Sequence, residues 1–397
     1  MADFQQYRAL FPHTQNMVYM NHASVSPLST RVTRAMTEFL HRRSVTEVDV
    51  YPGFSETVLK TKNLIGQLIH ASSKDIAFQT NTSEGLNLLA NGIKWKRGDR
   101  IILFSKDFPA VTQTFGKLIK EGVHLDLIRD RDGRIEVDDI LRAMKPTTQL
   151  VCLSHVQFLN GFRLNLEEVG RLCNERGIIF AVDAIQSLGV IPVDVKKMKI
   201  DFLSSGGQKW LMGPMGTAFV YVSEELRTML NQAYVGWLSV ENPWTFFDLG
   251  QRLAKDARRY EIGTLNAIGI VGLAESIGLL MEIGIKNIEK QVTDLNHYLL
   301  QGMSTYGVRP AMPYEHDFIS GIVSFQISEP ELIAAKLKEQ NIVVSAREKY
   351  LRVSPHFYNT TEEIDTLLRV LKDIDYKIKY EKSKAFFPFP LKSEAKP

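Results

Sequence analysis

A regular alternation of short apolar runs and helical patterns dominates the chain from about residue 75 to residue 222. The apolar runs indicate strands at 76–79, 100–104, 123–128, 150–156, 178–184, 201–205 and 217–222. Amphipathic helical patterns such as 83–93 and 165–177 separate most of them. Strands that alternate with helices at this spacing predict a largely parallel sheet covered by helices on both faces. We therefore expect an α/β fold built on a mainly parallel seven-stranded sheet.

A different pattern follows the predicted sheet. An aromatic segment at 234–250 leads to a long apolar helical pattern over about 266–303. Glu275 and Glu282 interrupt this pattern, which favours a core helix over a membrane span. Strand-like segments at 321–327 and 350–355 and helical patterns at 330–340 and 361–374 predict a smaller α+β unit. The predicted organisation is an N-terminal segment packing with the small domain, a large domain, a small domain and a tail, at 1–20, 21–285, 286–380 and 381–397.

Composition excludes several classes of function. The 48 basic and 45 acidic residues give a formal net charge of +3, so no basic surface for nucleic acid or membrane is indicated. Cys152 and Cys173 are the two cysteines, and no CxxC or HExxH spacing occurs, so neither a disulfide framework nor a metal site is expected. The N-terminal sequence lacks a signal-peptide pattern, and the predicted location is the cytoplasm.

Polar residues stand directly after four of the predicted strands. In open α/β sheets ligands bind outside the carboxyl ends of the strands, so these residues are expected to share one rim. They are Thr82 and Ser83, His155, Asp183 with Gln186, and Lys209. Each has an ordinary explanation by itself: Thr82 and Ser83 open a helix and suit an N-cap as well as a phosphate, and a lone histidine is more often structural.

Together the four positions supply what pyridoxal 5′-phosphate (PLP) requires. A helix start binds the phosphate, and a lysine forms a Schiff base. A carboxylate keeps the pyridine nitrogen protonated, so that the ring withdraws electrons. The nucleotide alternatives lack their motifs, because the chain contains neither GxGxxG after a strand nor GxxxxGK[ST]. The residues therefore predict a PLP site.

The segment 182–222, VDAIQSLGVIPVDVKKMKIDFLSSGGQKWLMGPMGTAFVYV, resembles the class V aminotransferase family of fold-type-I PLP enzymes. That family includes cysteine desulfurases, isopenicillin-N-epimerase-like proteins and kynureninase. The shared series is Asp-x-x-Gln, Pro-Val-Asp, Lys and Gly-Pro-x-Gly, and the resemblance extends from 18–28 to 351–365. It implies a homodimer with active sites shared across the interface.

The resemblance also implies roles for cofactor-binding residues. Lys209 would hold the cofactor and move the α-proton, Asp183 would pair with the pyridine nitrogen, and His155 would stack on the ring. The remaining expected cofactor contacts are Thr82 and Ser83 at the phosphate, Gln186 near the ring hydroxyl, Gln208 beside Lys209, and Thr264. The position of Thr264, in RRYEIGTLN at 258–266, typically reaches the phosphate of the neighbouring subunit.

Substrate contacts are implied in the same way. Arg352 matches the arginine that binds the substrate α-carboxylate in a bidentate manner, which lysine does poorly. Asn21 and Trp237 are expected at the substrate, although an aromatic cluster is more often core or dimer interface. For Arg347 an exposed charge is favoured over a second anion contact.

Departures from the family pattern bear on the reaction. Gly206 and Gln208 replace the serine and histidine that desulfurases usually carry before the lysine, and Phe158 replaces an asparagine. A desulfurase also needs a thiolate acceptor on a C-terminal loop, and no cysteine occurs after residue 173. Persulfide-forming chemistry is therefore disfavoured.

The sequence predicts a PLP enzyme acting at the α-amino group and Cα of a small amino acid through a Lys209 Schiff base. Transamination, epimerisation and elimination of a β-substituent remain open, with a lean toward the epimerase and lyase group from HVQFLNGFR at 155–163. The alternatives are a desulfurase and a PLP-fold binding protein without activity. The substrate side chain, the amino acceptor and any partner protein are not predicted.

Overall fold

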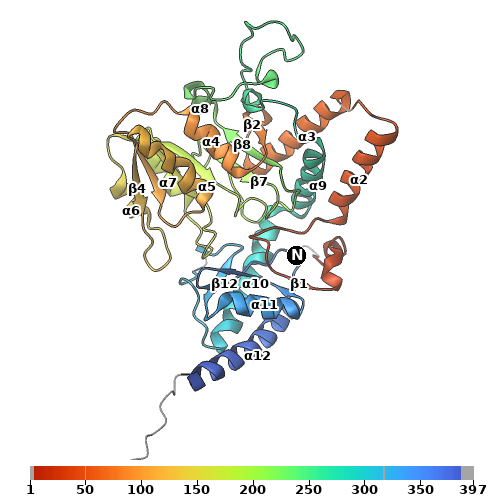
Figure 1. The fold of residues 1–397 in the computed structure, drawn as a ribbon, viewed down its shortest axis with the longest axis vertical. Helices are drawn as coiled ribbons and strands as arrows, with labels where there is room; N and C mark the ends of the chain where they lie inside the picture. The colour runs from red at the N-terminus through yellow and green to blue at the C-terminus, as the bar shows by residue number, and fades with distance from the viewer. Residues whose placement is uncertain (1–3, 50, 316–317, 386–397) are drawn as a thin grey trace, which may run out of the picture.

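The computed structural model describes residues 4–49, 51–315 and 318–385. Figure 1 shows two parts, a sheet with its helices above and the C-terminal elements, in blue, below. Within the predicted tail, residues 386–397 lie outside the described residues.

The large part contains a seven-stranded sheet in the order β2-β8-β7-β6-β5-β3-β4. Strand β8 is antiparallel to both β2 and β7, and the other pairs are parallel. The prediction of a mainly parallel seven-stranded sheet is thereby confirmed. The strands are β2 Ile76–Gln79, β3 Arg100–Phe104, β4 His124–Ile128, β5 Thr148–Ser154, β6 Ile179–Asp183, β7 Phe202–Gly206 and β8 Ala218–Val222.

Two hydrophobic cores lie on the two faces of this sheet. Along β5, Val151 and Leu153 belong to one core and Cys152 to the other, as the period of two in a strand requires. The helices of the large part are α2 Thr30–Val45, α3 Tyr51–Ile69, α4 Thr82–Gly92, α5 Pro109–Gly116, α6 Val137–Ala143, α7 Leu166–Glu175, α8 Glu224–Met229 and α9 Ala267–Ile283.

The small part has a core of its own, formed by apolar residues of α10, α11, α12 and their strands together with Met20. Its three-stranded sheet has the order β11-β12-β9, and the N-terminal strand β1 pairs in parallel with β10. The N-terminal segment is thus joined to the C-terminal part by a strand pair. The elements are α1 Gln5–Arg8, β1 Val18–Tyr19, α10 Ile285–Thr305, β9 Val323–Gln326, α11 Pro330–Glu339, β10 Ile342–Val343, β11 Ser345–Arg347, β12 Tyr350–Val353 and α12 Thr361–Ala385.

The helical pattern expected over 266–303 forms two helices. Gly284 stands between α9 and α10 with φ of +88°, a conformation that glycine adopts without strain and that ends a helix. The two helices are bent by 78° at this point. Among the described helices none is long and apolar enough by itself to cross a membrane, and α9 with α10 meets those criteria only as this bent pair.

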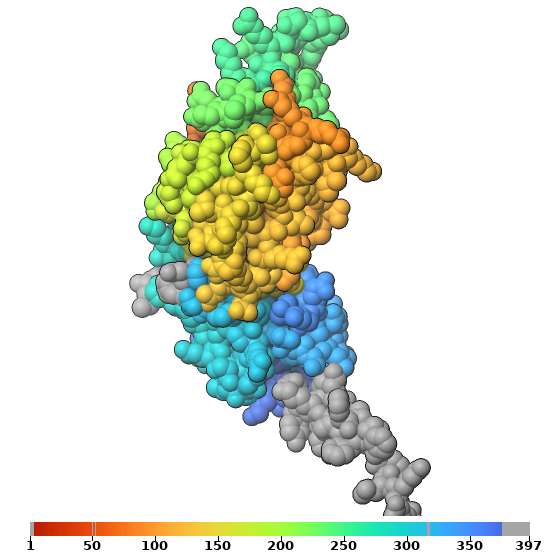
Figure 2. All heavy atoms as spheres, turned by 90° about the vertical axis from the view of Figure 1, so that its left-hand side faces the viewer, coloured from red at the N-terminus to blue at the C-terminus, as the bar shows by residue number. Residues whose placement is uncertain are grey.

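The aromatic segment at 234–250 extends from the large part. It forms the green projection at the end of the molecule in Figure 2. Phe247 and Leu249 are 97% and 100% exposed, so this segment is not part of the core of the chain itself.

Candidate active site

The carboxyl ends of β6 and β7 bring two predicted residues to one edge of the sheet. Asp183 ends β6 and is 1% exposed, and Lys209 follows β7 by three residues. The Oδ1 atom of Asp183 accepts a hydrogen bond of 3.0 Å from the Ile185 N–H. The two groups interact electrostatically: the positive charge of Lys209 lowers the pKa of Asp183, and the negative charge of Asp183 raises the pKa of Lys209.

Burial and neighbouring charges shift both pKa values. Burial, followed by repulsion from Asp107, raises the pKa of Asp183, and the Ile185 N–H and Lys209 oppose this. Burial lowers the pKa of Lys209 from its ordinary value of 10.5. Attraction to Asp183 opposes that change, while Arg352 and Arg347 add to it. The site thus contains an amine that gives up its proton more readily than an exposed lysine.

Close backbone packing holds the loop that carries Lys209. The Gly207 N–H donates to the Thr217 carbonyl at 2.8 Å, and the Gly213 N–H donates to the Gly207 carbonyl at 2.8 Å. A Cβ on Gly207 would lie 2.9 Å from Leu273 Cδ1 and 3.1 Å from the Thr217 oxygen. The glycine therefore allows the loop to pack against α9 and β8, which fixes the base of the lysine.

Trp210 anchors the same loop from the other side. Its ring is fully buried, and its Nε1–H donates to Gln186 Oε1 at 2.9 Å. Gln186 Nε2 in turn donates to the Ala23 carbonyl at 3.0 Å. Gln186 is expected near a ring hydroxyl of the cofactor; in the structure both ends of its amide bind the protein.

The start of α4 presents the predicted anion site. Asn81 caps the helix by accepting from the Glu84 N–H at 2.9 Å. The Thr82 Oγ1 atom is buried and has no hydrogen-bond partner among the described residues. Ser83 follows it, half-buried, in the first turn. An unpartnered buried hydroxyl at a helix start suits a phosphate ligand.

Phe108, which the sequence analysis missed, lies under the lysine. Lys209 Nζ is 5.5 Å from the centroid of the Phe108 ring, and the Phe158 ring meets that ring edge-on at 5.2 Å. The Asp107 carboxylate accepts from the Phe108 N–H at 2.8 Å and from the Ser154 N–H at 3.0 Å, which ties this loop to β5. Phe108 follows β3, so its position after a strand is the signal that could have identified it.

His155 is not brought to this group. It lies in a bend directly after the last residue of β5, whereas the Ser154 hydroxyl binds the Asp107 carboxylate. Its imidazole lines a separate cavity of about 600 Å³ with Phe162 and Arg163. The aromatic ring that faces Lys209 is therefore that of Phe108, and the position of His155 does not support the ring-stacking role expected for it.

Arg352 and Asn21 meet at Ser24. Arg352 is 1% exposed, and its Nη2 donates to Ser24 Oγ at 2.8 Å and its Nη1 to the Phe158 carbonyl at 2.7 Å. Ser24 Oγ donates to Asn21 Oδ1 at 2.7 Å. Arg347 also reaches Ser24, with Nη2 at 3.0 Å, so the expectation of a freely exposed charge at Arg347 is wrong.

Other predicted residues lie at or beyond the edge of this group. Gln208 is half-buried beside Lys209, and its carbonyl accepts from the Ser26 N–H at 2.8 Å. Thr264 is exposed and its Oγ1 lies 3.2 Å from the Tyr51 hydroxyl. Thr264 and Trp237 share a pocket of about 330 Å³ with other aromatic residues, and Lys209 is not among its lining residues.

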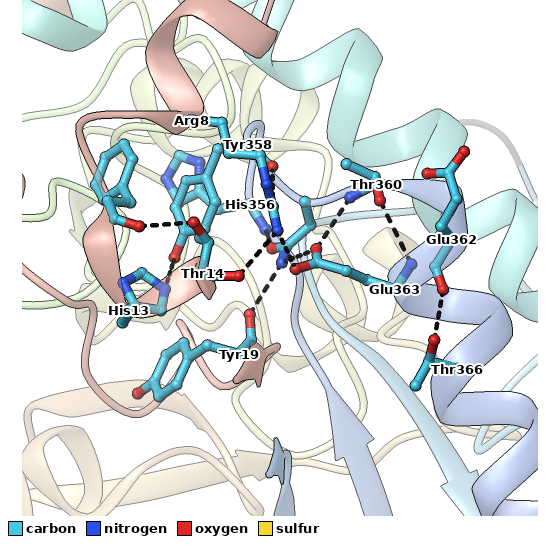
Figure 3. A network of polar contacts seen from close by, with 12 residues as sticks. Arg8, His13, Thr14, Tyr19, His356, Tyr358, Thr360, Glu362, Glu363 and Thr366 are labelled. Atoms are coloured by element: carbon cyan, nitrogen blue, oxygen red, sulfur yellow. Dashed lines mark hydrogen bonds and ion pairs between the residues drawn. The ribbon is translucent and has the colours of Figure 1, made fainter. Parts of the chain in front are cut away.

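A buried polar network supports the site from the N-terminal side. The His22 Nδ1–H donates to the Ser354 carbonyl at 2.8 Å, so its Nε2 accepts from the Tyr358 hydroxyl at 2.6 Å. Figure 3 shows Tyr358 between His13, at 3.2 Å, and Arg8, whose Nη1 donates to the Tyr358 carbonyl. His356 donates from Nε2 to the Trp210 carbonyl at 3.1 Å. The network connects the N-terminal segment and the small part to the Lys209 loop.

Neither cysteine is positioned for reaction. Cys152 and Cys173 are both 0% exposed and free. Burial raises the pKa of Cys152 well above its ordinary value and that of Cys173 to about 12. Among the described residues no cluster of His, Cys, Asp and Glu could hold a metal ion.

A lysine and a carboxylate at the carboxyl edge of a mainly parallel sheet, with a helix start for an anion and a small C-terminal part, define the class of fold-type-I PLP enzymes. The chain belongs to the aminotransferase class-V family, whose model matches residues 18–367. The resemblance seen in the sequence is confirmed.

Individual proteins show the same relationship. A Pyrococcus abyssi protein named "Probable cysteine desulfurase" is 31% identical over 93% of this chain and 97% of its own. The apo structure of a cysteine desulfurase from Thermococcus onnurineus NA1 has a TM-score of 0.88 and 29% identity over 95% of this chain and 99% of its own. A lysine variant of C-DES, with glycine covalently linked to the PLP cofactor, shares the fold with a TM-score of 0.85 at 22% identity over 92% and 99%.

The chain is accordingly a PLP-dependent enzyme. Its own residues fit the cofactor: the Thr82 hydroxyl is buried without a partner, the Asp183 carboxylate is buried, and the Lys209 amine stands over an aromatic ring. These are the groups that a phosphate, a pyridine nitrogen and an aldehyde require.

Proposed function

We propose that the enzyme acts at the α-carbon of a small amino acid and uses Lys209 as the proton carrier, without a protein thiolate. The observation that supports this best is a chain of contacts: Lys209 faces Phe108, whose ring meets Phe158, and Arg352 binds the Phe158 carbonyl. Both cysteines, in contrast, are buried in the cores.

Each residue has a specific task in this proposal. Bound PLP supplies an electron-withdrawing ring, which makes the α-hydrogen of an amino acid acidic. Lys209 holds the cofactor through Nζ and later accepts the α-proton, because its lowered pKa suits a general base. Asp183 holds a proton at the pyridine nitrogen, and Thr82 and Ser83 bind the phosphate. Phe108 takes the ring-stacking role.

Arg352 binds the substrate α-carboxylate. Its planar guanidinium suits a carboxylate, and its Nε is already fixed by the Ser345 hydroxyl at 3.2 Å. Asn21 orients Ser24 and through it the arginine. The position to which Lys209 returns the proton separates transamination from epimerisation, whereas β-elimination requires that the β-substituent leaves with its electron pair after the α-proton is removed.

The proposal includes a homodimer. Thr264 and the aromatic residues around it form an exposed apolar surface that is remote from Lys209 of the same chain. A second copy placed there would bring Thr264 to the phosphate of its partner. The two buried free cysteines fit a reducing cytoplasm.

The test of the central proposal is covalent. Purified enzyme should absorb visible light, and borohydride should bleach this band and fix the cofactor on the peptide that contains Lys209. Lys209→Ala should lose both the band and turnover, and Lys106→Ala, at an exposed lysine, should keep both. A colourless protein that takes up no PLP would contradict the proposal. Three assays then distinguish the reactions. Formation of a keto acid indicates transamination, release of pyruvate with sulfide indicates β-elimination, and deuterium exchange at Cα without either product indicates epimerisation.

Cysteine desulfuration is the second candidate, because the Pyrococcus relative carries that name. The burial of Cys152 and Cys173 opposes it, since the acceptor must be a reachable thiolate. Incubation with cysteine followed by persulfide trapping decides between the two. Persulfide on either cysteine, absent from the matching Cys→Ser variant, would favour the desulfurase.

A further inference from the structure

Two arginine side chains lie on one face of the small sheet. Strands β11 and β12 are antiparallel, with Ser345 opposite Arg352 and Arg347 opposite Tyr350. Because side chains alternate along a strand, Arg347 and Ser345 share a face, and Arg352 lies on that face as a diagonal neighbour of Arg347. The fold therefore places two cations side by side at the substrate end of the site.

The two guanidinium groups share one hydroxyl group. Ser24 Oγ donates its proton to Asn21 and accepts from Nη2 of both Arg347 and Arg352, at 3.0 and 2.8 Å. The other contacts of the arginines go to the Phe158 and Ala346 carbonyls and to the Ser345 hydroxyl. All of these partners are neutral.

Neither arginine forms an ion pair with a carboxylate among the residues that the structure describes. Arg352 is 1% exposed and Arg347 is half-buried. Burial, followed by repulsion from Arg347, lowers the pKa of Arg352 to about 9. Two adjacent cations without a counter-ion are unfavourable until anions bind. The substrate α-carboxylate, which is assigned to Arg352, supplies a counter-ion for one of the two arginines.

We propose that Arg347 binds a second carboxylate, at the far end of the substrate side chain, so that the substrate class is an amino acid with an acidic side chain. Ser24 sets the separation of the two anion sites by holding both guanidinium groups. This inference rests on the proposed function, because it takes Arg352 as the site of the α-carboxylate.

The test uses ligands that lack an amino group and therefore bind without reacting. Calorimetric titration of the holoenzyme with succinate, glutarate and adipate, each compared with its half-amide, measures what the second charge contributes. The series is needed because chain length sets the distance between the two charges. The best dicarboxylate should bind about ten- to a hundredfold more tightly than its half-amide.

Two variants test whether Arg347 causes the tighter binding of the dicarboxylate. Arg347→Gln should reduce the ratio to about one by weakening the diacid much more than the half-amide, which places no second charge at Arg347. Lys349→Gln removes an exposed cation two residues away and should preserve the ratio. Equal affinities in the wild-type enzyme, or an Arg347→Gln variant that weakens diacid and half-amide alike, would overturn the inference. The second outcome would mean that both arginines hold one carboxylate.

Failure of the proposed function has a different signature. A protein without the visible cofactor band fails as a PLP enzyme whatever its affinity for diacids. A diacid preference that disappears in Arg347→Gln would still support the second anion site in that case. A coloured enzyme without the preference would reject only the role of Arg347.

Discussion

The Nζ atom of Lys209 lies 5.5 Å from the centroid of the Phe108 ring. This relationship joins the end of β7 to the loop after β3, although about a hundred residues separate them. An apolar ring at this position offers stacking area and no ionisable group. Proton transfers in the site therefore fall to Lys209 and not to the residue beneath it.

Replacing Phe108 with alanine should weaken PLP binding. Aromatic pairs contribute about 0.5–1.5 kcal/mol beyond their buried area, so the dissociation constant should rise at least about two- to twelvefold. Absorbance titration of the cofactor-free protein measures it. Phe108→Tyr should retain the affinity, and Phe247→Ala, at a residue that is 97% exposed, should leave it unchanged. An unaltered affinity in Phe108→Ala would remove the stacking role.

The rate of PLP uptake should rise with pH through a midpoint near the lowered pKa of Lys209, about 8, because only the neutral amine attacks an aldehyde. Arg352 helps to keep that pKa low. Arg352→Gln removes a nearby positive charge, which favours the protonated amine, so the midpoint should move to higher pH. Stopped-flow absorbance measures the rate. A midpoint that moves to lower pH would contradict the electrostatic account.

Gly85→Ala should destabilise the enzyme and weaken PLP binding. A Cβ at Gly85 would lie 2.4 Å from Ser204 Oγ and 2.5 Å from Val220 Cγ1, so α4 would have to move away from the sheet. We expect a loss of about 1–3 kcal/mol in the free energy of unfolding. Gly278→Ala in α9 meets no atom within 4 Å and should stabilise by about 0.4–1 kcal/mol. Urea unfolding of both variants checks the opposite signs.

Stability should fall as the pH drops below 6.5. Burial lowers the pKa of His22 and His155 well below that ordinary value and that of His356 to about 4. The unfolded chain therefore binds more protons than the native state in this range, and each such histidine removes about 1.4 kcal/mol per pH unit. The contribution of His356 is lost between pH 6.5 and about 4.

The slope of unfolding free energy against pH measures this effect. His356→Asn lowers stability at every pH because it breaks the bond to the Trp210 carbonyl. Its slope between pH 6.5 and 5 should nevertheless be smaller than that of the wild type. A stability that stays constant from pH 7 to 5 would contradict the prediction, because it would mean that the native state takes up as many protons as the unfolded chain.

The sequence predicts the elements whose signal is local. The seven strands are found within a few residues of the predicted positions, because buried parallel strands are continuous apolar runs. Lys209 and Asp183 come together because they end neighbouring strands. The break at Gly284 was missed since the apolar pattern continues through it.

Residues whose position depends on distant contacts were not predictable in this way. Phe108 carries no polar signal after its strand, whereas His155 does carry one but lines a different cavity. The partners of Gln186 and Arg347 are Trp210 and Ser24, which nothing in the local sequence connects with them. The N-terminal loop that carries Ser24 is held at the site by contacts with residues far along the chain, in the small part and in the Lys209 loop.

The pairing of β1 with β10 has a consequence for biosynthesis. Ser354 Oγ bonds the Met20 carbonyl across 334 residues of sequence, and β1 finds its only strand partner in β10 among the described residues. During synthesis on the ribosome, Asn21 and Ser24 therefore emerge early, but they can contact Arg347 and Arg352 only after almost the whole chain has been made. A nascent chain that ends before the small part already contains Ser24 and Asn21 but lacks both arginines that Ser24 binds.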